Sequence, residues 1–116
     1  MRLLTNLQWL DADGALADGW ILIESDRISD CGHGAAPQLA EATVESLEGA
    51  IVLPGFIDLH CHGGGGGSYL SGSTEEAHQA ALTHRRHGTT TSLASLASAS
   101  HGDLLRQIEA LLPLVA

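Results

Sequence analysis

The sequence is poor in aromatic side chains, in basic side chains and in cysteine. Phe, Tyr and Trp make up only 3% of the 116 residues, so the core must be built from Leu, Ile, Val and Ala. Five basic residues stand against 14 acidic ones, which gives a formal net charge of −9. A chain this acidic repels phosphate backbones and anionic membranes. The composition therefore argues against a nucleic-acid partner and against a membrane partner.

Cys31 and Cys61 are the two cysteines, too few for a disulfide framework and not in a CxxC spacing. The first residues lack the apolar segment of a signal peptide. The longest apolar run is far shorter than a membrane span. Together these absences predict a reducing, cytoplasmic setting.

Residues 1–53 carry the patterns of β-strands. Residues 3–10 and 19–24 are apolar runs bounded by turn-forming residues. After the second run a polar turn leads into a short strand at Ile28, which predicts a β-hairpin. Residues 43–47 alternate apolar and polar side chains and predict one more short strand.

Residues 54–116 alternate strand and helix patterns. Residues 56–62 are nearly continuously apolar, which is typical of a buried strand in a parallel sheet. A capping box at Ser73 predicts a helix to about residue 87, and β-branched residues 89–93 predict the next strand. Residues 100–112 predict a second, amphipathic helix. This order predicts an α/β fold with parallel strands, and because no strand follows the second helix we expect a truncated chain.

The motif that carries chemistry lies at the end of the strand at residues 56–62. Since side chains alternate along a strand, we expect Asp58, His60 and His62 on one face and Cys61 on the other. Two imidazoles so placed can bind one divalent cation, and β/α barrels have their active sites at this end of the strands. We therefore predict that His60 and His62 are metal ligands. Asp58 either orients an imidazole or is a structural carboxylate beneath the site.

A run of five glycines, residues 63–67, follows the histidine pair. Its backbone N–H groups could cradle a phosphate, but it lacks the Lys-Ser/Thr of a P-loop. We expect a loop that closely approaches the metal and a sugar, with Gly64 and Gly65 as candidate substrate contacts. His84 and His87 lie three residues apart on the predicted helix. Without an evident third ligand, they are interpreted as surface or cap histidines.

Residues 52–62 read VLPGFIDLHCH and resemble the first-strand signature of the amidohydrolase superfamily. The glycine run, and the tetrapeptide HGTT at residues 87–90, are similar to N-acetylglucosamine-6-phosphate deacetylases. The resemblance implies the start of a metal-dependent TIM-like (β/α)8 barrel preceded by strands of a small β-sandwich. Residues 1–53 would belong to the sandwich and residues 54–116 to the first β/α units of the barrel.

The resemblance also implies an activity. The full-length protein would hydrolyse the acetamide of N-acetylglucosamine 6-phosphate, a small amino-sugar phosphate, to glucosamine 6-phosphate and acetate. His60 and His62 would hold one of two divalent ions per subunit, with zinc expected and iron, manganese or cobalt as alternatives. The other ligands and the general-base aspartate would lie beyond Ala116. No catalytic residue is therefore expected in this fragment, which we expect to be inactive alone, and the full-length protein is expected to form a homodimer.

Two other interpretations stay open. Cyclic-amide hydrolases of the dihydroorotase or hydantoinase type share the PGxIDxHxH strand but lack the glycine run. Alternatively, the chain is an inactive truncated product whose apolar helix faces and strand edges have nothing to cover them.

Overall fold

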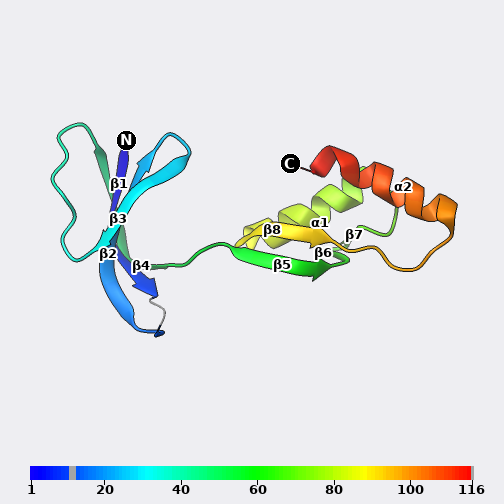
Figure 1. Cartoon of the computed structure of the whole chain (residues 1–116), viewed down its shortest axis with the longest axis horizontal. Coiled ribbons are helices and arrows are strands. Elements are labelled where there is room, and N and C mark those ends of the chain that lie inside the picture. The colour runs from blue at the N-terminus through cyan, green and yellow to red at the C-terminus, as the bar shows by residue number, and fades with distance from the viewer. Residues whose placement is uncertain (11–12, 116) are drawn as a thin grey trace. The chain divides into compact units, whose positions relative to one another are not determined.

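The computed structural model describes residues 1–10 and 13–115. The chain forms two compact units, Met1–Pro54 and Gly55–Ala116 (Figure 1). Ala116, the last residue of the predicted barrel portion, lies outside the described residues. Among the residues described, no helix combines the length and the apolar character that crossing a membrane requires.

The first unit is a single four-stranded sheet. Its strand order is β3-β2-β1-β4, with β1 (Arg2–Leu10), β2 (Leu16–Glu24), β3 (Arg27–His33) and β4 (Thr43–Val52). The antiparallel pairing of β2 with β3 confirms the predicted hairpin. β4 lies parallel to β1 and continues past the predicted end at residue 47.

Among the described residues of this unit, the buried side chains are all aliphatic. Leu3 and Leu7 of β1 are almost fully buried, together with Ile21 and Leu22 of β2. The expectation of an aliphatic core is therefore confirmed in this unit.

The second unit holds the alternating strand and helix pattern. Its elements are β5 (Phe56–Cys61), β6 (Gly63–Gly64), β7 (Gly67–Ser68), α1 (Thr74–Arg86), β8 (Thr89–Ala94), α2 (His101–Leu111) and a 3₁₀ turn (Leu112–Leu114). β5 and β8 pair in parallel across the α1 connection. This confirms the predicted α/β class, because parallel neighbours require a crossover such as a helix.

Both ends of α1 are set by the residues that predicted them. The Ser73 hydroxyl oxygen accepts the Glu76 backbone N–H at 3.3 Å and donates to Glu75 Oε2 at 2.8 Å. At the other end Gly88 takes φ of 94°, and its N–H donates to the Arg85 carbonyl at 3.1 Å. Such a left-handed residue after a helix favours glycine.

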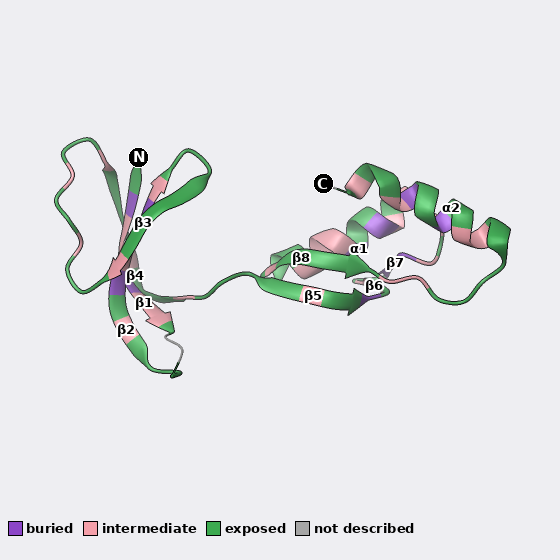
Figure 2. Ribbon diagram, viewed as in Figure 1, coloured by how far each residue is buried: buried purple, intermediate pink, exposed green. Residues whose placement is uncertain are grey.

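The prediction of a buried strand at residues 56–62 is wrong for this chain. Ile57 and Leu59 of β5 are 65% and 68% exposed, and Figure 2 shows most of β5 and β8 as exposed. Only Cys61 joins the buried cluster of this unit, with Tyr69 and the α1 residues Ala77 and Ala80. Within Gly55–Ala116 the described residues therefore leave the apolar side chains of Ile57 and Leu59 uncovered.

Candidate functional site

The two histidines of the predicted metal pair come together at the carboxyl end of β5. His60 Nε2 and His62 Nε2 lie 3.0 Å apart, and the ring planes are at 82° with centroids 4.8 Å apart. Two nitrogens bound to one tetrahedral zinc, with Zn–N bonds of about 2.0–2.1 Å, are about 3.4 Å apart. Both side chains are exposed. The pair is thus close to the spacing that a shared cation requires, and it can be reached from solvent.

The second ring nitrogen of His62 is held by the backbone. His62 Nδ1 lies 2.8 Å from the Ser95 carbonyl oxygen. A carbonyl only accepts, so Nδ1 carries a proton, and in the neutral ring Nε2 is the acceptor, which takes the His60 Nε2–H when no cation is bound. Metal-binding histidines are typically oriented in this way.

Ser95 also holds the strand segment that carries the pair. Its N–H donates to the Cys61 carbonyl at 2.7 Å, and its hydroxyl oxygen accepts the Cys61 N–H at 3.2 Å. Ser95 follows β8 directly, so the parallel pairing of β8 with β5 brings it here. Nothing in the sequence pattern pointed to this role, because the contacting residues are 33 or more positions apart in the chain.

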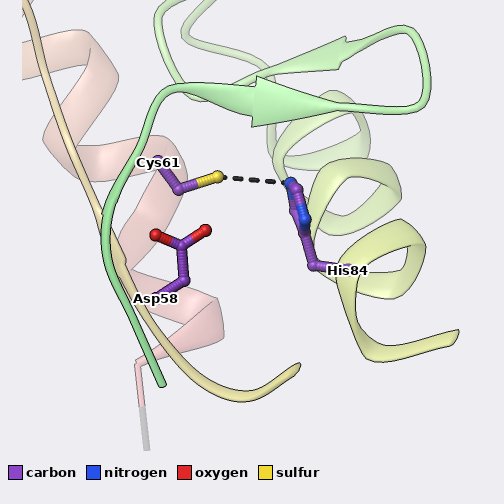
Figure 3. A group of neighbouring side chains, drawn as sticks. All are labelled: Asp58, Cys61 and His84. Atoms are coloured by element: carbon purple, nitrogen blue, oxygen red, sulfur yellow. Dashed lines mark hydrogen bonds between the residues drawn. The ribbon is translucent and has the colours of Figure 1, made fainter. Parts of the chain in front are cut away.

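Asp58 does not share the side of the strand that carries the imidazoles. The pairing of β5 with β8 shifts register between Asp58 and Cys61, and such a bulge interrupts the alternation of side chains. The Asp58 carboxylate instead lies with Cys61 Sγ and the His84 imidazole, with the ligand atoms all within 4.8 Å of one another (Figure 3). The predicted common face of Asp58, His60 and His62 is therefore wrong. Asp58 contacts His60 through the backbone of His60, because the His60 N–H donates to Asp58 Oδ1 at 3.1 Å.

His84 is part of this cluster and not a surface histidine as interpreted from the sequence. It is half-buried, and its Nε2 lies 3.0 Å from the Gly63 carbonyl oxygen and 3.3 Å from Cys61 Sγ. Tyr69, which was not singled out in the sequence, borders the cluster and is only 4% exposed. Burial raises the pKa of the Tyr69 hydroxyl, and the neighbouring Cys61 raises it further.

The glycine run forms the short hairpin β6–β7, which lies directly against α1. A Cβ atom on Gly67 would overlap the Glu76 carbonyl oxygen, and one on Gly65 would overlap the Thr83 side chain. A Cβ on Gly64 would meet the His84 ring. The glycines are therefore explained by close approach to the helix. The substrate role of Gly64 and Gly65 stays a prediction.

Comparison with known proteins places this chain beside deacetylases. No family model matches it. A solved structure of N-acetyl-D-glucosamine-6-phosphate deacetylase from Mycobacterium smegmatis, a mutant in complex with N-acetyl-D-glucosamine-6-phosphate, is 42% identical with a TM-score of 0.80, and the match covers 97% of this chain and 29% of that one. N-acetylglucosamine-6-phosphate deacetylase of Bacillus subtilis is 22% identical over 102 residues, which are 88% of this chain and 26% of that protein.

A third match is to an enzyme that is not named as a deacetylase. Imidazolonepropionase of Alkaliphilus oremlandii is 47% identical over 53 residues, which are 42% of this chain and 13% of that enzyme. The chain thus spans less than a third of the length of the proteins it matches. The resemblance to N-acetylglucosamine-6-phosphate deacetylases is confirmed over nearly all of this chain.

Proposed function

Given that this chain shares sequence and fold with N-acetylglucosamine-6-phosphate deacetylases, we propose that the whole protein hydrolyses the acetamide of N-acetylglucosamine 6-phosphate. Water adds to the amide carbonyl and the C–N bond breaks, which gives acetate and glucosamine 6-phosphate. The observation that carries the proposal is the convergence of His60 Nε2 and His62 Nε2 to 3.0 Å at the end of a β/α-type strand.

His60 and His62 would hold a divalent cation through their Nε2 atoms, and Ser95 would keep His62 in the tautomer that can bind it. Such a cation acts as a Lewis acid, which polarises an otherwise unreactive amide carbonyl and activates water. Zinc is the expected ion, with iron, manganese and cobalt as alternatives, and we propose two ions per subunit. The remaining ligands and the general-base aspartate would come from residues beyond Ala116.

We further propose that Gly55–Ala116 is the start of a TIM-like barrel and that Met1–Pro54 is part of a β-sandwich. The TM-score of 0.80 against a deacetylase over 97% of this chain supports this assignment. The 116 residues alone, without the other ligands and the general base, would release no acetate. The whole protein would be a cytoplasmic homodimer.

The test is acetate release from N-acetylglucosamine 6-phosphate by the whole protein and its variants. His60→Ala removes one ligand, and we expect activity to fall by more than about 100-fold, because even partners that only orient a ligand contribute about 10–100-fold. The matched control is His78→Ala, an exposed histidine of α1, which should leave the rate unchanged. Unchanged activity in His60→Ala would refute the ligand role.

A second candidate is a cyclic-amide hydrolase. The match to imidazolonepropionase over 53 residues supports this candidate. The same protein should therefore be assayed with dihydroorotate and hydantoin. Hydrolysis of either, with no acetate release from the amino sugar, would favour this candidate. The glycine run does not decide between the two, since its contacts with α1 explain it without a substrate.

A further inference from the structure

The side chains of Asp58, Cys61 and His84 form a cluster between β5 and α1. Cys61 Sγ lies 3.3 Å from His84 Nε2, and the ligand atoms of all three residues lie within 4.8 Å of one another (Figure 3). The Gly63 carbonyl oxygen lies 3.0 Å from His84 Nε2 and 3.5 Å from Cys61 Sγ. One thiol, one imidazole, one carboxylate and one carbonyl are therefore gathered in one place, and with no cation bound His84 Nε2 donates to the Gly63 carbonyl.

We propose that this cluster is a further cation site that binds zinc, separate from the histidine pair and additional to the two ions proposed above for the amide chemistry. Sulfur and nitrogen ligands on one tetrahedral zinc are about 3.6 Å apart, given bonds of about 2.3 Å and 2.0–2.1 Å. The observed separation of 3.3 Å is close to that value. The carboxylate of Asp58 would supply a third protein ligand, and because ligand atoms within 4.8 Å of one another can be farther apart than one zinc allows, the side chains would close slightly around the cation. When the cation binds, the Cys61 thiol proton is released to solvent and the His84 proton moves from Nε2 to Nδ1, which ends its hydrogen bond to the Gly63 carbonyl.

The ligand types select the cation. Thiolate and imidazole favour zinc over magnesium or calcium, which prefer oxygen ligands. Cys61 is 6% exposed and packs against Tyr69, which is 4% exposed, whereas Asp58 and His84 are half-buried, so the thiol side of the site is shielded from bulk water. Sulfur, imidazole and carboxylate are all ligand types that zinc accepts in proteins.

The cluster and the histidine pair are chemically distinct. His60 and His62 are exposed and offer nitrogen only, whereas Cys61 between them is buried against α1. A cation in the cluster would link β5 to α1 across 23 residues of sequence. It would therefore stabilise the contact between strand and helix and would take no part in the amide chemistry.

The test is a cobalt(II) titration of the full-length protein, followed by the thiolate-to-cobalt charge-transfer absorption in the near ultraviolet. We expect this band in the wild type and in Cys31→Ser, since Cys31 is exposed and lies in the other unit. The band should vanish in Cys61→Ser. It should persist in His60→Ala, because the histidine pair has no sulfur. Absence of the band in the wild type, or its survival in Cys61→Ser, would overturn the proposal.

Two more variants separate ligation from a general loss of folding. Asp58→Asn and His84→Gln keep the approximate size of each side chain, and circular dichroism verifies that the fold persists. We expect each to weaken cobalt binding by about tenfold or more, on the scale known for residues around metals. Unchanged cobalt affinity in both variants would refute the site. Acetate release after His60→Ala reports on the histidine pair, whereas the cobalt band reports on the cluster. Failure of the proposed deacetylase function and failure of the proposed cation site are therefore recognised separately.

Discussion

A single methyl group at Gly67 tests whether the glycine run exists for packing against α1. The Cβ of Gly67→Ala would overlap the Glu76 carbonyl oxygen and lie 3.1 Å from the Ala80 backbone nitrogen. These are backbone atoms of a helix, so no side-chain rotation relieves the overlap. Hairpin and helix must separate, which loosens the packing around Ala77 and Ala80, both fully buried.

The expected cost is about 3 kcal/mol, the upper end of the range for overpacked cores. With a urea dependence of about 1–3 kcal/mol/M, the unfolding midpoint should fall by about 1–3 M. The assay is urea unfolding followed by far-ultraviolet circular dichroism. Gly67 has no left-handed φ, so the substitution measures contact and not backbone strain.

The matched control is Gly102→Ala in α2, where an added Cβ has no atom within 4 Å. Alanine is a better helix former than glycine, so this variant should be more stable by about 0.5–1 kcal/mol. The two substitutions therefore have opposite expected signs. If Gly67→Ala unfolds within about 0.5 kcal/mol of the wild type, the usual range for neutral surface changes, the packing explanation is wrong.

Two further substitutions follow from local contacts. Ser73→Ala removes the hydroxyl that accepts the Glu76 N–H at the start of α1, and thermal unfolding should show a loss of about 1 kcal/mol; Ser73→Thr, which keeps the hydroxyl, should recover most of it. Arg2→Ala breaks the 2.7 Å ion pair with Glu45, in which the Arg2 side chain is 58% exposed and the Glu45 side chain 48% exposed. The loss of unfolding free energy should therefore stay below about 1 kcal/mol and shrink further at high salt. A larger, salt-independent loss would contradict this.

Local signals predicted the elements of this chain well. Ser73 and Gly88 fixed the two ends of α1, because a cap hydroxyl and a left-handed glycine act through contacts within a few residues. The β2–β3 hairpin followed from the hydrophobic pattern for the same reason. The parallel β5–β8 pair followed from the strand–helix–strand order of the sequence, because a helical crossover joins parallel neighbours. The hairpin β6–β7 was missed, since a run of glycines carries no strand pattern.

The sequence alone determined the α/β order, the position of the histidine pair at a strand end, and the family resemblance. These depend on residues near one another along the chain. Tertiary structure decided what the pair and its neighbours contact: Ser95 reaches His62 across the β5–β8 pairing, and the bulge after Asp58 turns its carboxylate toward Cys61. Strand register and helix approach bring together residues far apart in the chain, and no periodicity in the sequence encodes those distances.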